Sequence, residues 1–249
     1  SRKAAEELLR TDTLSRTAVI SFCDPPSVGK PAPTPPLDYA GKAAQEKAFW
    51  DTYQSNGSRI GYQSAFAGYG WTSATFKPRH NMAPKDAYMM FRESRISGDL
   101  VSILQGLGVT LDFSNTTNMP YLFQNSMFTR IGVVDASKAA HLTGVFLNMH
   151  NLVTIDKLIV SDTGSVAFSD TFGTCEKLQN ITVEGVIGQN VNLSLCPLLT
   201  HDSIINIISC LQDLTGTGNT RTLTLGATNL AKLTDAEKAV ATEKGWTLA

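Results

Sequence analysis

Histidine is the side chain that most often serves as a general base or a zinc ligand, and this sequence has few histidines. The four lie far apart, so that none has another three or four residues away: His80, His141, His150 and His201. A zinc site needs several converging ligands, and sequences that form one usually show closely spaced His and Cys pairs. We therefore expect these histidines to be solvated or structural, and we predict no bound metal and no cofactor.

The cysteines give no chemical signature either: Cys23, Cys175, Cys196 and Cys210. They contain no CxxC pair, which argues against a disulfide framework and against a zinc site. Cys23 follows an apolar segment, as in a phosphatase loop, but that loop requires an arginine where this chain has Gly29. No nucleophile elbow, P-loop or dinucleotide-binding glycine pattern is present. Because free cysteines are commonly buried, we predict buried thiols in a protein that is not an enzyme.

The elements around these residues are set by a repeat. Residues 111–186 contain three copies of one pattern, in which a short apolar strand and a polar stretch precede a Phe and then an Ile. Five Phe residues mark the pattern along the chain: Phe66, Phe91, Phe123, Phe146 and Phe172. Their spacings are 25, 32, 23 and 26 residues. A period in the twenties is typical of a solenoid, in which no unit can bury its own apolar face.

Two departures from the period have simple interpretations. The long interval between Phe91 and Phe123 contains residues 98–106, which we expect to form an inserted helical turn or two. After Phe172, the next apolar residue at the repeat distance is Leu195, which would mark a sixth, degenerate unit. The sequence therefore predicts about five units and a sixth, degenerate unit.

Each position in the repeat predicts a direction for its side chain. We expect the five Phe rings to fill the interior, together with the inward residues of the strands, Leu111, Phe113, Ile181 and Val183. The outward residues of successive strands would then form a strand ladder: Asp112, Ser114, Asp135, Lys157, Thr182 and Glu184. Solenoids bind partners through such repeated polar faces, so this ladder is the candidate binding face. A solvated face that binds nothing is the alternative.

The segments at the two ends of the repeats are predicted to form caps. Residues 41–54 predict an amphipathic helix that ends at Asn56-Gly57. Residues 200–214 predict a helix with Thr200 as its N-cap and a buried stripe of Ile204, Ile205, Ile208 and Leu211. Strands are expected at 221–226 and 246–249, on either side of a helix that opens with a capping box at 234–237 and ends at Gly245.

The N-terminal residues have a different character. We expect a short helix at 4–10 and a strand at 17–22, followed by six prolines between Pro25 and Pro36 that indicate an extended linker or arm. The predicted organisation is therefore an arm or linker at 1–40 and a repeat domain at 41–249. In that domain, 41–60 form the N-terminal cap, 61–199 the repeats and 200–249 the C-terminal cap.

Two segments carry a family resemblance. TLDFSNTTNMPYLFQNS resembles the S-N-x-T-N-M-x-x-M-F-x-x-S unit of BspA-like leucine-rich-repeat proteins of gut Firmicutes and their prophages, with Leu122 in place of the second Met. TFGTCEKLQNITV is similar to the x-F-x-x-C-x-x-L-x-x-I-x-V unit of the same family, which matches at Phe172, Cys175, Leu178, Ile181 and Val183. The resemblance covers about residues 41–249. It implies an α/β right-handed leucine-rich-repeat solenoid with irregular or helical returns, a role in adhesion or protein binding, and no catalysis.

Charge and hydropathy argue against two kinds of partner, nucleic acid and the interior of a membrane. The 21 basic and 22 acidic side chains give a net charge of -1, which provides no electrostatic footprint for nucleic acid. No apolar run reaches the roughly 18 residues that a membrane span needs, so we expect no membrane insertion. No signal peptide is visible in the charged first residues. The chain lacks an initiator Met, so the removal of an N-terminal leader stays an open alternative.

Three functions follow as hypotheses. The leading one is a non-enzymatic repeat protein that binds a protein or glycan at a bacterial cell surface, outside the cell or on a virion. The second is a structural module of a prophage tail or baseplate, with 1–40 as the attachment arm. The third is a hydrolase with an unrecognised pocket between the repeats and a cap.

Overall fold

The structure is a computed structural model that describes residues 62–74, 76–78 and 81–249. Several predictions fall outside these residues: the arm at 1–40, the helical cap at 41–60, Cys23 and His80. In the part of the chain that the structure describes, no helix has both the length and the apolar character that crossing a bilayer requires.

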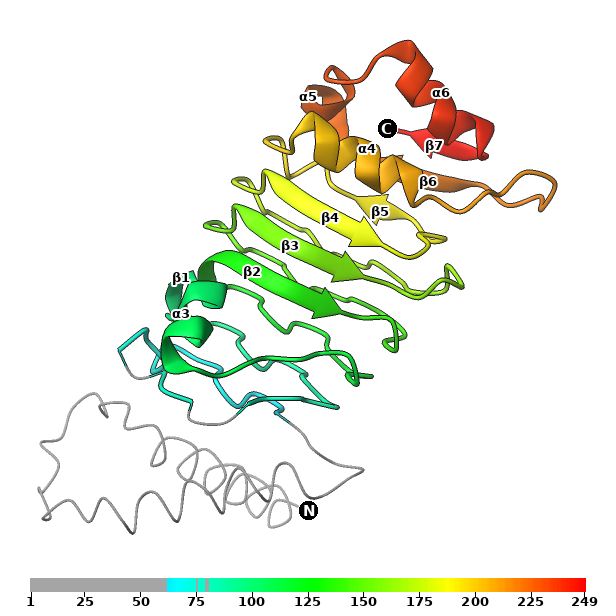
Figure 1. The fold of residues 1–249 in the computed structure, drawn as a ribbon. Helices are drawn as coiled ribbons and strands as arrows, with labels where there is room; N and C mark the ends of the chain where they lie inside the picture. Colours follow the sequence, from blue (N-terminus) through cyan, green and yellow to red (C-terminus); the bar gives the residue numbers. More distant parts are fainter. Residues whose placement is uncertain (1–61, 75, 79–80) are drawn as a thin grey trace, which may run out of the picture.

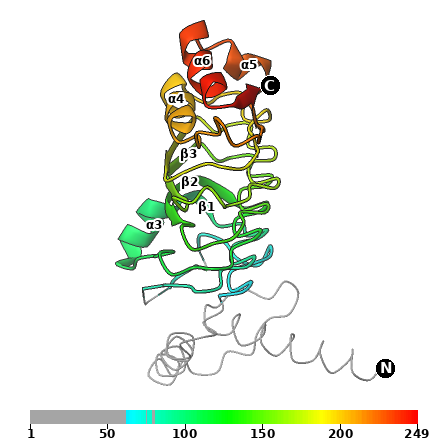
Figure 2. The same cartoon turned by 90° about the vertical axis from the view of Figure 1, so that its right-hand side faces the viewer.

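The repeats stack their strands into one parallel sheet. Its strands are β1 (Ser97–Asp99), β2 (Met127–Asp135), β3 (Thr154–Ile159) and β4 (Asn180–Glu184), and their order in the sheet is the order of the sequence. Figure 1 shows the strands side by side, and Figure 2 shows that the chain returns between them on the opposite side of the molecule. Each of the four units from Phe91 to Phe172 therefore adds one strand to the sheet, and the Phe66 unit adds only an isolated bridge between Thr72 and Arg95.

The opposite side of the stack is built from turns with a regular backbone. In all five units, the residues two before and two after the Phe have a positive φ, and most of them are not glycine. The pairs are Ser64 and Gly68, Met89 and Glu93, Tyr121 and Asn125, Gly144 and Asn148, and Asp170 and Thr174. Left-handed backbone at non-glycine residues is strained, so the surrounding structure must hold it in place.

Hydrogen bonds between units hold these turns, which we call the turn ladder. The amides of Tyr121, Phe123 and Asn125 donate to the carbonyls of Thr143, Val145 and Leu147 in the next unit at 2.8–2.9 Å. The same three bonds recur at all four junctions between the five Phe units. Because alternating left- and right-handed residues point their amides the same way, each turn presents its donors to the acceptors of the next.

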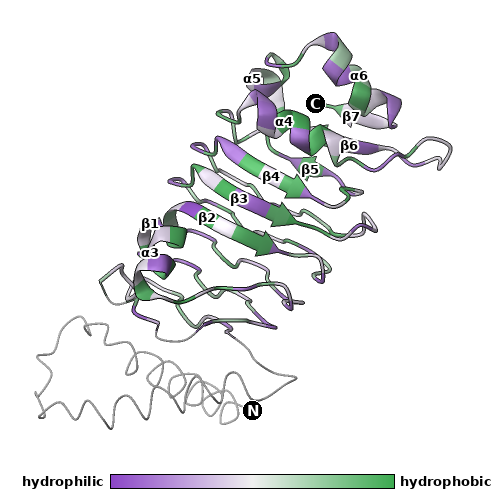
Figure 3. Ribbon diagram, in the orientation of Figure 1, coloured by the Kyte–Doolittle hydropathy of each residue, from purple (hydrophilic) through white to green (hydrophobic). Residues whose placement is uncertain are grey.

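The core runs along the stack between the sheet and the turn ladder. Neighbouring rings of the five Phe lie 5.3, 5.4, 6.0 and 5.6 Å apart between centroids, with interplanar angles of 24° or less. All five are buried, so the prediction that they fill the interior is confirmed. Ile181 and Val183 are also buried as predicted, and Figure 3 shows hydrophilic and hydrophobic residues alternating along β4.

The prediction of a strand around Leu111 is wrong. Leu111 makes an isolated bridge to Met82, and the regular strand of this unit is β2, further along the chain. Phe113 is buried as expected, whereas Leu111 is only partly buried. The Asp112 carboxylate accepts a hydrogen bond from the Ser114 amide at 2.8 Å, which makes a turn at the place where the strand was expected.

The expected helical insertion is α3 (Leu100–Leu107). Asp99 caps its first turn by accepting from the amides of Val101 and Ser102, and Gly108 ends it at φ 67°. The helix packs over β2, where a Cβ added to Gly132 would lie 3.1 Å from the Val101 side chain.

The C-terminal part adds a second parallel sheet and three helices. The sheet contains β5 (Val191–Asn192), β6 (Arg221–Thr224) and β7 (Trp246–Leu248), in that order. The helices are α4 (His201–Ser209), α5 (Gly226–Leu230) and α6 (Asp235–Glu243). The predicted Thr200 N-cap and the capping box of Thr234 and Glu237 are confirmed, while β5 and α5 were not predicted.

Two apolar assignments in this part are corrected. Leu195 is 53% exposed, and the neighbouring Leu193 and Cys196 are buried instead, because the turn reverses before Leu195 reaches the interior. Helix α4 ends at Ser209, so the prediction of a helix as far as residue 214 is wrong, and the buried Leu211 lies beyond the helix. The buried stripe of α4 contains Ile207 rather than Ile205, since Ile204, Ile207 and Ile208 share the face that meets the core.

Candidate functional site

The outward face of the first sheet is the most distinctive surface of the repeats. Its floor is β2, β3 and β4, and helices lie at its two ends, with α3 beside β1 and β2 and α4 beside β4 (Figures 1 and 2). The outward side chains of neighbouring strands therefore lie between two helical walls.

At one end, α4 takes the place that another strand would occupy. Ser203 Oγ accepts a hydrogen bond from the Ile181 amide at 3.0 Å. Asn206 Oδ1 accepts from the Val183 amide at 2.6 Å, and Asn206 Nδ2 donates to the Val183 carbonyl at 3.2 Å. These side chains satisfy the backbone of β4, which would otherwise be an open sheet edge.

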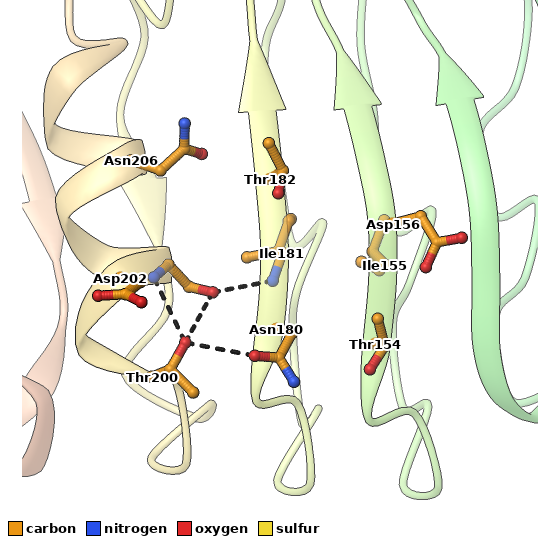
Figure 4. A pocket seen from close by; sticks show the side chains of 10 residues that line it. Thr154, Ile155, Asp156, Asn180, Ile181, Thr182, Thr200, Asp202 and Asn206 are labelled. Carbon is orange, nitrogen blue, oxygen red and sulfur yellow. Dashed lines mark hydrogen bonds between the residues drawn. The ribbon is translucent and has the colours of Figure 1, made fainter.

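A groove of about 520 Å³ lies where this helix meets the sheet. We call it the β4–α4 groove, and ten residues line it: Thr154, Ile155, Asp156, Asn180, Ile181, Thr182, Thr200, Asp202, Ser203 and Asn206. Figure 4 shows β3 and β4 on one side of the groove and α4 on the other. Its two isoleucines are buried beneath it, so the groups that reach the groove are polar.

Hydrogen bonds fix part of this lining. Thr200 Oγ1 lies 3.0 Å from Ser203 Oγ and 3.4 Å from Asn180 Oδ1, as drawn in Figure 4. Since Ser203 also holds the Ile181 amide, the first turn of α4 is tied to β4 by a short chain of bonds.

A charge network borders the groove. Arg130 on β2 binds both carboxylate oxygens of Asp156, at 2.7 and 2.8 Å, and its remaining nitrogen lies 3.3 Å from Asp99. The hydrogen bond and the charge of Asp156 raise the pKa of Arg130. Partial burial alone would raise the pKa of Asp99, but hydrogen bonds from Ser102 and Val101 outweigh it and hold that pKa below its ordinary value. This bidentate geometry orients Asp156 and removes it from the set of free acceptors.

The structure brings together three of the six residues of the predicted strand ladder. Lys157, Thr182 and Glu184 lie on the outward face, and Lys157 Nζ is 2.7 Å from Glu184 Oε2. Both partners of this ion pair are largely exposed, so it stabilises the fold little. Thr182 is the one predicted residue that also lines the groove.

The other three residues lie at turns, and the ladder does not extend to them. Asp135 is the last residue of β2, where its carboxylate accepts from the Ser137 amide at 2.9 Å. Asp112 and Ser114 form the equivalent turn one unit earlier. An Asp that binds the amide two residues ahead ends a strand, and for this reason these side chains serve the backbone.

Sequence reasoning missed Arg130, Thr154 and Asn180, although a signal for them existed. Each directly precedes an Ile of the repeat, and the register pairs Arg130 with Thr154 and Thr154 with Asn180. Aligning the repeats on Ile131, Ile155 and Ile181 would have placed these three residues in one row. No pattern in the sequence indicated that α4 would contribute side chains to the groove.

The histidines and cysteines that the structure describes take structural or surface positions. His150 lies 2.9 Å from Glu176, and His201 lies 2.8 Å from Glu237 at the surface. Cys175 and Cys196 are buried and donate to the carbonyls of Phe146 and Phe172, so the prediction of buried thiols is confirmed for these two.

Neither chemistry nor metal binding is evident at these residues. The hydrogen bond with Cys196 and burial raise the pKa of the Cys175 thiol, which is the opposite of what a nucleophile needs. Within residues 62–249, apart from the three residues not described, no three His, Cys, Asp or Glu side chains are grouped to hold a metal ion.

The chain matches no protein-family model, no curated protein and no solved structure.

Proposed function

We propose that this chain is a right-handed leucine-rich-repeat solenoid of the BspA-like kind that binds a protein or glycan without catalysis. The observation that carries the proposal is the outward face of the first sheet. Consecutive units place polar side chains there in register, between α3 and α4, and a groove of about 520 Å³ opens at one end. Repeat proteins use extended faces of this kind to bind partners.

Within each unit, one set of residues holds the stack together and another set faces outward, and this separation supports the proposal. The Phe residues and the turn ladder are fully engaged in holding the stack, since the rings are buried and the turn amides are bonded. The outward side chains of the strands do not pack in the core in this way. A surface whose side chains are free to differ from unit to unit is suited to recognition.

A non-catalytic role agrees with the chemistry of the groove. Asp156 is bound to Arg130, and Asp202 is fully exposed, so neither carboxylate lies in the apolar surroundings that a general acid usually occupies. We place the protein at a bacterial cell surface, outside the cell or on a virion, on the strength of the family resemblance alone.

The test is a pull-down from bacterial cell-wall and mucin fractions with the full chain and two variants. Thr182→Arg places a long side chain in the middle of the proposed face. Thr247→Arg makes the same change at an exposed position of β7, away from it. We expect the first variant to lose the captured partner and the second to retain it. Equal capture by both would refute the face as the binding surface.

A further inference from the structure

Four groups in the β4–α4 groove are available to a ligand. The hydroxyl groups of Thr154 and Thr182 and the Nδ2 amide group of Asn180 make no hydrogen bond among the described residues. The fourth group is the Asp202 carboxylate, whose side chain is fully exposed and lies 3.6 Å from His201 Nδ1. The set therefore contains two groups that both donate and accept, one donor and one strong acceptor.

Among the described residues, the lining of the groove contains no Arg, Lys or His, and the basic side chains beside it are paired with carboxylates. Arg130 is held by Asp156 and Asp99, Lys157 is paired with Glu184, and His201 is 2.8 Å from Glu237. Each of these three side chains already faces a carboxylate, and Asp202 adds a further negative charge. Phosphate, sulfate or carboxylate groups of a ligand would meet repulsion here, so the electrostatics favour a neutral ligand.

The groove also lacks the anchor of a protein interface. Binding energy between proteins concentrates at aromatic or Arg side chains in dry apolar pockets. The two apolar residues of the lining, Ile155 and Ile181, are 1% and 2% exposed and offer no such surface. What the lining does offer is closely spaced hydrogen-bonding groups.

From these three observations we infer that the β4–α4 groove is a binding site for a neutral glycan. Adjacent sugar hydroxyls both donate and accept, so they match Thr154, Thr182 and Asn180, and the Asp202 carboxylate is a strong acceptor for a pair of hydroxyls. The inference deepens the proposed function by naming the ligand class for that same face.

The site is organised before a ligand arrives. Thr200 donates to the side-chain carbonyl of Asn180, and Ser203 accepts from the backbone amide of Ile181. Asn206 accepts from the Val183 amide and so holds β4 from the next turn of α4. A ligand that enters therefore does not need to order the walls, which matters for a site built from individually weak hydrogen bonds.

The test begins with an array of immobilised oligosaccharides. One arm contains neutral hexose and N-acetylhexosamine chains, and the other contains sialylated, uronic-acid and sulfated chains of similar length. The full chain should bind members of the neutral arm. Titration calorimetry with the best neutral oligosaccharide then measures the affinity of the variants.

Two groove variants have matched controls. Thr182→Val removes a hydroxyl and should weaken binding several-fold, with Thr247→Val on β7 as the control. Asp202→Asn should weaken it about tenfold, with Asp235→Asn as the control, because both acids are fully exposed in the first turn of a nine-residue helix. The controls should bind as the parent does, and thermal unfolding should show that all four variants are folded.

Three results would overturn the inference: binding only in the acidic arm, no binding in either arm, or groove variants that bind as their controls do. A protein partner that is captured by the parent and lost by Thr182→Arg, together with a blank array, would leave the proposed function standing while removing the glycan. Capture unaffected by Thr182→Arg would remove both.

Discussion

The two sides of the repeat stack follow different rules. On the turn side, left-handed residues flank the Phe in every unit, and the same three hydrogen bonds recur at each of the four junctions. On the sheet side, the strands have three to nine residues, and two of the three strand pairs contain register shifts. The turn side sets the spacing of the units, which leaves the sheet side free to vary in length and in outward chemistry. The candidate site lies on the variable side.

The largest effect should follow from breaking the Phe stack. Phe123 lies between Phe91 and Phe146 at 5.4 and 6.0 Å and is completely buried. Phe123→Ala should lower the free energy of unfolding by about 3–5 kcal/mol, because it leaves a cavity in the middle of the core. Chemical denaturation measures this. Val133→Ala, at a half-exposed residue of β2, is the control and should cost under about 1 kcal/mol.

The rigidity of the turn ladder can be tested by comparing one glycine on the turn side of the stack with one glycine on the sheet side. Gly144 has φ 59°, and an added Cβ would lie 2.5 Å from the Tyr121 ring, so Gly144→Ala should cost about 2–4 kcal/mol through strain and overlap. Gly132→Ala on β2 meets only the Val101 side chain at 3.1 Å and should cost about 1 kcal/mol or less. Similar losses in the two variants, measured by chemical denaturation, would mean that the turn side is no stricter than the sheet.

A smaller effect should follow at the end of the sheet. Asn206→Ala removes the partner of the Val183 amide and one of the two donors to the Val183 carbonyl, which also accepts from Cys210 Sγ, and this should cost about 1–3 kcal/mol. Hydrogen exchange should show faster exchange of the Val183 amide. Exchange at the Phe123 amide, which donates to Val145 within the turn ladder, should keep its rate relative to global unfolding. An unchanged Val183 rate would mean that α4 does not seal this edge.

The smallest effect concerns pH and the C-terminal cap. Hydrogen bonds from the Thr234 amide and hydroxyl, and then from His201, hold the pKa of Glu237 below its ordinary value. A lowered pKa in the folded state stabilises the protein above the ordinary pKa, and this stabilisation is lost as the pH falls through the lowered value. Acid titration followed by circular dichroism should show α6 loosening in that range.

Glu237→Gln should remove most of this acid-dependent step, whereas Glu243→Gln in the last turn of the same helix should retain it. If the two variants titrate alike, the capping box does not account for the pH dependence. The turn ladder itself should be insensitive to pH in this range, since its bonds between units are backbone hydrogen bonds.

Local signals made several features predictable. The inserted helix α3, the N-cap of α4 and the capping box of α6 follow from residues within one or two turns of each other, and the Phe positions follow from the repeat period. The errors occurred where a local pattern was ambiguous. Asp112 and Asp135 were assigned to an outward ladder because they follow apolar residues, yet each closes a turn on the amide two residues ahead.

The sequence by itself determined the period of the repeat, the identity of the buried rings and the helices with strong caps, because each depends on spacing and on local chemistry. Only the tertiary structure decided the left-handed turns, the edge sealed by Ser203 and Asn206, and the groove that contains Thr182. The turns keep strained backbone only because neighbouring units bond to them, and the groove exists only because a helix from beyond the repeats packs beside β4. Such features depend on which segments meet, and the sequence pattern of a single unit does not contain that information.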